Sequence, residues 1–171
     1  MSKSLSSLVA CAFAFALFCV AAPSFAQTAR PYDLAQLSPE VRAAVEQARE
    51  AQRLALMAAA RAEGNVAGHT RFTGTGGDNY AGQCAPCTEG DAQRHGVGVL
   101  SWTDGELYAG QHVADGEIGG RKHGYGVYII TAGGVYEGEF NADRRNGYGV
   151  MWDGQGRIAY QGRWANDNRA Q

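Results

Sequence analysis

The sequence predicts a mainly β protein: an elongated antiparallel sheet of stacked β-hairpin repeats, preceded by one α-helix and a cleaved signal peptide. Three observations support this fold class. Glycine accounts for 24 of the 171 residues, about twice its usual share of ~7%, and 19 of these glycines lie in residues 80–171. A short tyrosine–glycine pattern recurs through the same segment. Residues 31–63, by contrast, are rich in Ala, Glu, Gln and Arg, which are good helix formers.

The charge of the chain is close to balanced. Fifteen Lys and Arg residues stand against 17 Asp and Glu residues, and nearly all of the basic residues are Arg. Nucleic-acid-binding domains are usually strongly basic, so we expect no nucleic-acid partner. The length allows one modest domain.

The N-terminus has the features of a signal peptide. An uncharged, apolar run over residues 8–22 follows Lys3, and Pro23 and the small-residue triplet Ser24-Phe25-Ala26 come next. We therefore predict a signal peptide over residues 1–26, cleavage before Gln27, and a periplasmic or secreted protein. The alternative is an uncleaved anchor, but fifteen apolar residues are few for a membrane-spanning helix.

Residues 27–64 are predicted to be an N-terminal helical segment. Ser38 and Pro39 supply the N-cap and the first helical position, and Gly64 with Asn65 supplies the end, which bounds a helix at residues 39–63. A narrow apolar stripe recurs at spacings of roughly three and four residues: Val41, Val45, Ala48, Ala55, Leu56 and Ala59. Because alanine contributes little burial energy, we expect a partly solvated helix that lies on the domain or is loosely tethered to it. The alternative is a helix that self-associates or docks on a partner.

Residues 65–79 are rich in Gly and Thr and have no hydrophobic periodicity. This composition predicts a linker.

Residues 80–171 are predicted to form a repeat domain of about three and a half units, each 24 to 28 residues long. Each unit opens with Tyr-x-Gly, at Tyr80, Tyr108, Tyr136 and Tyr160. The first three units continue with Gly-x-Gly-Val, and two of them close with Asp-Gly. Such a unit predicts a β-hairpin followed by a tight turn into the next unit.

Alternation along a strand predicts the two faces of the sheet. It puts Gly124, Gly126 and Tyr128 on one face, and Tyr125, Val127 and Ile129 on the other. Glycine inside a strand needs a steric reason, and we expect an aromatic ring from a neighbouring strand to lie over its bare backbone. The tyrosines are thus interpreted as packing residues. The predicted repeat core consists of Tyr80, Gly82, Tyr108, Gly110, Gly124, Gly126, Tyr136, Gly138, Gly147, Gly149, Tyr160 and Gly162.

The third unit, from Tyr136 to Gly154, resembles the MORN (membrane occupation and recognition nexus) repeat throughout, and the resemblance extends over residues 80 to about 164. It implies a single twisted sheet of stacked hairpins, and a role in scaffolding, dimerisation or membrane association instead of catalysis. The last unit stops after its first strand at Trp164, which predicts an uncapped edge strand there.

The first unit departs from the repeat by an insertion that holds Cys84-Ala85-Pro86-Cys87. In an exported protein we expect a disulfide that closes the enlarged hairpin. A thioredoxin-like dithiol is an alternative, but it needs a helix after the first cysteine. A zinc site is another alternative, with ligands taken from His95, His112 and His123. Covalent haem attachment is excluded because Thr88 follows the second cysteine, and we expect no cofactor and no metal.

The basic residues form a second pattern. Arg94, Lys122 and Arg145 share one repeat position, and Arg121 and Arg144 share the position before it. Stacked hairpins would place them along one sheet edge at intervals of about 10 Å. Such a row suits anionic headgroups or an acidic protein surface. Ordinary solvated loop charges are the alternative, because residues 80–171 hold eight basic and eleven acidic residues.

The predicted function is that of a non-enzymatic repeat scaffold for protein–protein interaction or self-association in the cell envelope. We see no catalytic triad, phosphate loop or glycosidase carboxylate pair. Antiparallel self-association at the Trp164 edge is the preferred form. The alternatives are peripheral binding to anionic membranes through the basic edge, and thiol–disulfide exchange at Cys84 and Cys87.

Overall fold

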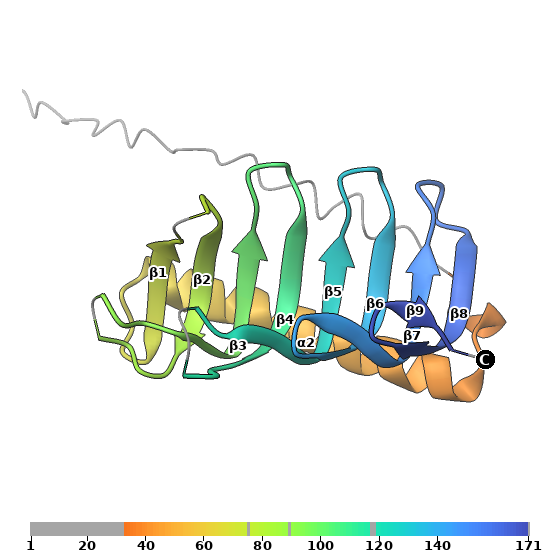
Figure 1. Ribbon diagram of the computed structural model, residues 1–171, viewed down its shortest axis with the longest axis horizontal. Coiled ribbons are helices and arrows are strands. Elements are labelled where there is room, and N and C mark those ends of the chain that lie inside the picture. Colours follow the sequence, from red (N-terminus) through yellow and green to blue (C-terminus); the bar gives the residue numbers. More distant parts are fainter. Residues whose placement is uncertain (1–32, 75, 89, 117–118, 171) are drawn as a thin grey trace, which may run out of the picture.

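The computed structural model describes residues 33–170, except 75, 89, 117 and 118, so the predicted signal peptide lies outside the described residues. Within these residues, one α-helix precedes nine antiparallel strands that pair in chain order, which confirms the predicted fold class (Figure 1). The elements are η1 (Leu34–Gln36), α2 (Pro39–Glu63), β1 (His69–Thr73), β2 (Asn79–Cys84), β3 (Arg94–Ser101), β4 (Leu107–Val113), β5 (Arg121–Ile129), β6 (Val135–Asn141), β7 (Arg144–Trp152), β8 (Ile158–Ala165) and β9 (Asn168–Arg169).

Helix α2 begins and ends at the signals in its sequence. Ser38 Oγ accepts a hydrogen bond from Val41 N, Pro39 is the first helical residue, and Gly64 N–H donates to Ala60 O. Six of the eight residues in the buried stripe are alanine: Val41, Ala44, Val45, Ala48, Ala51, Ala55, Ala58 and Ala62. No helix among the described residues has the length and apolarity needed to cross a membrane.

Two members of the predicted apolar stripe were wrong. Leu56 is 39% exposed and Ala59 is only half-buried. Each residue of a helix is turned about 100° from the one before it, so Leu56 points away from the sheet when Ala55 points into it. The stripe follows Ala51, Ala55 and Ala58 because small side chains let the helix lie close to the sheet.

The helix lies across the strands and covers one face of the sheet. In Figure 1 it runs behind the strands from the β8 end of the sheet to the β1 end, and it contacts strands β1 to β8. Gln161 on β8 accepts from Ser38 N at 2.9 Å, and Arg71 on β1 pairs with Glu63 at 2.7 Å. The 25 residues of α2 span about 37 Å, which is close to the width of about 34 Å expected from the seven strand spacings between β1 and β8.

The two faces of the sheet hold different cores. On the helix side, Val127 and Val150 pack with Val41 and Val45, and Tyr125 and Ile129 lie against the same cluster. On the other side an aromatic cluster is formed by Tyr80, Leu100, Tyr108, Tyr136, Phe140 and Trp164. Tyr128 packs against this second cluster, so the predicted alternation along residues 124–129 holds.

The predicted linker over residues 65–79 was wrong in its centre. Residues His69–Thr73 form strand β1, which pairs with β2 in a register that puts Phe72 opposite Tyr80. The two rings lie 5.3 Å apart between centroids. Backbone pairing along β2 and this ring contact outweigh a composition that by itself favours a loop.

The prediction that Trp164 lies on an uncapped edge strand was also wrong. A turn at Asn166 and Asp167, both with positive φ, leads into strand β9, in which Arg169 pairs with Trp164. Trp164 is 4% exposed. A turn with two residues of positive φ suits a tight hairpin, and Asn and Asp tolerate that conformation.

Candidate functional site

The face opposite the helix is organised by a row of glycines and tyrosines. One glycine from each of strands β2 to β8 pairs with the next, in the order Gly82, Gly98, Gly110, Gly126, Gly138, Gly149 and Gly162. Each tyrosine lies along its own strand, with its hydroxyl donating to the carbonyl three residues later, as Tyr108 does to Gln111 O at 2.7 Å. A Cβ added at Gly126 would overlap the Tyr108 ring. The ring therefore fills the space that the glycines leave.

Gly124 and Gly147 serve a different purpose from the other predicted core glycines. They have φ of +65° and +107°, a conformation that favours glycine. The next N–H in each case donates to the side chain that follows Tyr-x-Gly: Tyr125 N to Gln111 Oε1, and Tyr148 N to Glu139 Oε1, both at 2.7 Å. These two glycines thus shape a bulge in the strand and are not covered by a tyrosine ring.

A ladder of rings extends between the tyrosines. The residue four positions after the tyrosine is His112, Phe140 or Trp164 in the second, third and fourth units. Each of these rings meets two tyrosines edge to face, with centroids 5.0 to 5.4 Å apart. This position was missed from the sequence, although aligning the units on their tyrosines displays it.

The predicted basic row forms joints between successive hairpins. Arg145 Nε pairs with Asp167 Oδ1 at 3.0 Å, in the turn of the next hairpin, and its guanidinium lies 4.5 Å from the centroid of Trp164. Arg94 pairs with Asp78 at 3.0 Å and donates to Gly120 O. Of the two residues at the preceding repeat position, Arg121 pairs with Asp115, whereas Arg144 is exposed. Arg94 and Arg145 are therefore folded onto the sheet instead of projecting as free cations.

Lys122 makes the corresponding joint through its backbone. Its N–H donates to Asp143 Oδ1 at 2.9 Å. Its ammonium lies over three rings, 5.0 Å from Trp102, 5.1 Å from Tyr128 and 6.0 Å from Tyr108. Burial lowers the pKa of Lys122, against the opposing effect of Asp143.

His112 is buried between the rings of Tyr80 and Tyr108. It is 4% exposed, and neither of its ring nitrogens makes a hydrogen bond of good geometry, although a polar contact with the Gly110 backbone acts against the fall in its pKa. Burial, together with the charges of Arg94 and Lys122, lowers its pKa to about 3, so it is neutral at physiological pH. It does not gather with His95 and His123: His123 is exposed and His95 Nδ1 lies 3.5 Å from Ala114 N. Across the described ranges no cluster of three or more His, Cys, Asp or Glu residues is placed to hold a metal ion.

An ion pair with a buried carboxylate joins the helix to the sheet face that it covers. Arg49 donates to both carboxylate oxygens of Glu137 at 2.9 and 3.0 Å, and Trp152 Nε1 donates to the same carboxylate at 2.8 Å. The Glu137 side chain is 5% exposed. Glu137 occupies the middle of Tyr-x-Gly, where the second unit has Ala109 packed against Ala55. The side chain at this position therefore differs between units according to the residue of α2 that packs against it.

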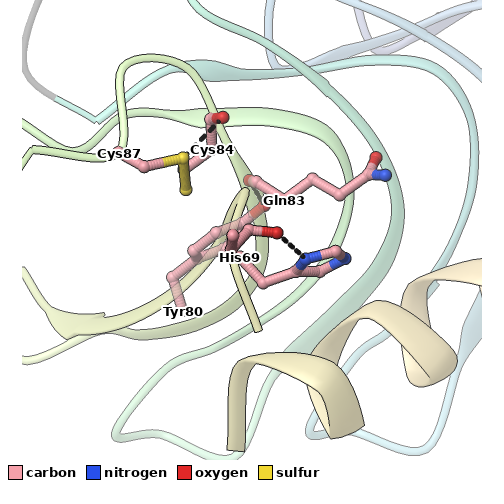
Figure 2. The surroundings of a disulfide bond; sticks show 6 residues. His69, Tyr80, Gln83, Cys84 and Cys87 are labelled. Carbon is pink, nitrogen blue, oxygen red and sulfur yellow. Dashed lines mark hydrogen bonds between the residues drawn. A yellow bond between two sulfur atoms is a disulfide. The ribbon is translucent and has the colours of Figure 1, made fainter. Parts of the chain in front are cut away.

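Cys84 and Cys87 are joined at the end of β2, where Figure 2 shows them above Tyr80 and His69. Their Cα atoms are 5.0 Å apart. Ala85 N donates to Gln93 O at 3.2 Å, which closes the insertion into a loop. Cys84 belongs to a strand, and the described residues between Cys87 and β3 contain no helix. The helix N-terminus that activates a thioredoxin-like cysteine is therefore missing from this segment.

Comparison with known proteins agrees with the repeat pattern. The family model described as MORN repeat matches at residues 91–106, 118–135 and 136–156. No curated protein matches the chain. The three matches cover strands β3, β5, β6 and β7 and the turns beside them. The glycine row, the stacked hairpins and these matches together show that the chain carries MORN repeats over residues 91–156.

Proposed function

We propose that the protein is a non-catalytic scaffold of the cell envelope that binds a second protein chain, and that self-association through a sheet edge is its preferred form. MORN repeats suggest a scaffold or a role in binding proteins or membranes. Strand β1 carries the finer proposal. Within the described part of the chain, β1 pairs on one side only, with β2. An edge strand presents backbone donors and acceptors that a second strand can pair with.

The two faces of the sheet offer less to a partner than its edge does. Helix α2 covers one face, and on the other face Arg94, Lys122 and Arg145 lie over the aromatic rings or in joints between hairpins. Cations that already have such partners are poorly placed to collect anionic headgroups. A protein strand at β1 is therefore favoured over a membrane at the basic row.

Export and the disulfide belong to the same proposal. The features of residues 1–26 favour a signal peptide, and a disulfide persists in an oxidising compartment. We assign Cys84 and Cys87 a structural role, which is to close the insertion between β2 and β3.

Two measurements test this proposal. Size-exclusion chromatography with light scattering on the purified exported protein should show a concentration-dependent dimer. Hydrogen exchange should show slower exchange of the β1 amides at high protein concentration. A monomer at every concentration, or a dimer in which β1 exchange is unchanged, would refute edge pairing. Flotation with anionic vesicles that is lost in Arg144→Glu would instead favour the membrane alternative.

A further inference from the structure

Strand β1, at one end of the sheet in Figure 1, presents a defined set of backbone groups at its free edge. Beside β2, Gly74 N donates to Asp78 O at 2.8 Å, and Cys84 N donates to Gly68 O at 3.3 Å. Hydrogen-bonded positions alternate along an antiparallel strand, so the even-numbered residues of β1 point their N–H and C=O groups at β2. The odd-numbered residues point theirs at the free edge: His69, Arg71 and Thr73.

The two faces of β1 carry different side chains. Phe72 lies on the aromatic face, with its ring centroid 5.3 Å from that of Tyr80. Arg71 lies on the face that α2 covers and pairs with Glu63, the last residue of α2, at 2.7 Å. Both side chains of this pair are more than half exposed. A hollow of about 510 Å³ opens beside the pair, and one cross-strand row lines part of it: Thr73, Asn79 and Ser101.

This edge is complementary to itself. It carries one exposed cation and one exposed anion, so a second copy related by a two-fold axis presents Glu63 to Arg71 and Arg71 to Glu63. The same axis makes the two β1 strands antiparallel. We propose that two copies pair through β1 in a single register, in which Phe72 lies on the axis and faces Phe72 of the second copy. This inference rests on the proposed self-association and deepens it.

The backbone restricts the possible registers. Only residues that point outward can bond across the edge, so odd-numbered positions must face odd-numbered positions. A register centred on Arg71 sets two guanidinium groups directly opposite each other, which is destabilising. A register centred on Thr70 needs the His69 N–H, which already donates to Val66 O at 3.1 Å.

Two centres remain, at Thr73 and at Phe72. A register centred on Thr73 forms one bonded pair within β1, which is Thr73 with its own copy. A register centred on Phe72 places Arg71 opposite Thr73 twice and forms four backbone hydrogen bonds. The greater number of hydrogen bonds favours the register centred on Phe72.

This register continues both faces of the sheet into the second copy. The two Phe72 residues occupy a non-hydrogen-bonded pair, whose Cα atoms are about 4.5 Å apart, so the ladders of rings of the two copies meet at the axis. On the other face, Arg71 of the second copy extends the row that begins at Thr73. Its side chain enters the hollow that Glu63 lines. Two separate ion pairs thereby become one group of four charges.

Single cysteines at positions 70 to 73 test the register. Each variant of the exported protein, with its Cys84–Cys87 bond intact, is oxidised mildly, and intermolecular disulfides are identified on non-reducing gels and by peptide mass. Phe72→Cys should cross-link, because a Cα separation of about 4.5 Å suits a disulfide. Thr70→Cys is the matched control on the same face, since the two copies of residue 70 would lie about 14 Å apart. Arg71→Cys and Thr73→Cys should cross-link poorly, at diagonal separations of about 7–8 Å.

Charge exchange gives a second test. Glu63→Arg should weaken the dimer about tenfold in light scattering, because each copy then presents only cations at the edge. Adding Arg71→Glu restores one charge of each sign and should restore the dimer. The matched control Glu50→Arg alters an exposed pair elsewhere on α2 and should leave dimerisation unchanged.

The outcomes separate the register from the proposed function. Cross-linking that is strongest at position 72, with rescue by the double charge exchange, supports the inference. A dimer that cross-links best at position 70, 71 or 73 would overturn this register and leave edge pairing in place. A dimer without cross-links at all four positions, or without rescue, would also overturn it. A monomer at every concentration would refute the proposed self-association itself.

Discussion

Replacing His112 with phenylalanine should stabilise the protein. Phe140 occupies the equivalent position of the next unit and meets Tyr108 and Tyr136 edge to face at 5.0 and 5.2 Å, so the ladder accepts this side chain. His112 makes the same ring contacts but buries two nitrogens without partners. Because an unsatisfied buried polar group costs about 1–3 kcal/mol, we expect the free energy of unfolding to rise by about that amount at pH 8.

The same substitution should alter the dependence of stability on pH. Folding lowers the pKa of His112 from 6.5 to about 3, so between these values the unfolded chain binds a proton that the folded chain does not. Above pH 6.5 His112 is neutral in both states and has no effect on the pH dependence. As the pH falls below 6.5, protonation favours the unfolded chain and the free energy of unfolding decreases. At pH 5 the loss is about 2 kcal/mol, at about 1.4 kcal/mol per pKa unit. In His112→Phe this contribution disappears.

Urea unfolding of both proteins at pH 8 and pH 5 measures the two effects. The advantage of His112→Phe should grow from about 1–3 kcal/mol at pH 8 to about 3–5 kcal/mol at pH 5. The reverse exchange, Phe140→His, is the matched control and should destabilise the protein more strongly at the lower pH. An advantage that is absent at pH 8 and constant between the two pH values would refute the argument that His112 is buried without partners.

Three further predictions concern packing and cross-links. Gly126→Ala should lower the free energy of unfolding by about 2 kcal/mol or more, because the new Cβ overlaps the Tyr108 ring; thermal unfolding measures this. Arg49→Met should lower the free energy of unfolding by about 2–3 kcal/mol, because Glu137 is left buried with the Trp152 indole N–H as its remaining partner. The loss is moderate because Arg49 itself is partly exposed. Urea unfolding measures this change, and hydrogen exchange should show faster opening of α2. Replacing both Cys84 and Cys87 with serine should cost about 2 kcal/mol, because the bond closes a short loop; urea unfolding of the oxidised parent provides the comparison.

The predictions for Gly126→Ala and Arg49→Met each have a matched control. Gly154 has no atom within 3.5 Å of an added Cβ, so Gly154→Ala should be nearly neutral. Arg53→Met breaks an exposed pair with Glu50 on the same helix and should leave the free energy of unfolding nearly unchanged. If Gly154→Ala proves as destabilising as Gly126→Ala, ring overlap is not the cause. If Arg53→Met matches Arg49→Met, burial of Glu137 does not determine the effect.

The sequence predicts the hairpins because their signals are local. Tyr-x-Gly, Gly-x-Gly and the turn residues lie within one unit, and each motif meets a steric requirement of the strand or turn in which it occurs. The bounds of α2 are likewise encoded nearby, at Ser38, Pro39 and Gly64. Strand β1 was missed because the contacts that stabilise it come from another strand: Phe72 pairs with Tyr80 of β2.

The candidate site was predicted less well, because its chemistry depends on contacts between units. The repeat position of Arg94, Lys122 and Arg145 was found, but their partners belong to the following hairpin or to loops far along the chain, as Asp167 and Asp78 do. A glutamate in a strand usually indicates a solvent-exposed position, but Glu137 is buried because α2 crosses the sheet there and places Arg49 against it. His112 is one polar residue in an aromatic ladder, which becomes visible once the rings are in place.

Because the length of α2 is close to the width of the sheet, the helix limits the number of hairpins that it can cover. One additional hairpin widens the sheet by about 9.6 Å, which corresponds to six or seven helical residues at about 1.5 Å each. Duplicating a unit without lengthening α2 would leave two strands with an uncovered apolar face. Repeat number and helix length should therefore change together, a constraint that simple solenoids, in which each unit covers only its neighbours, do not have.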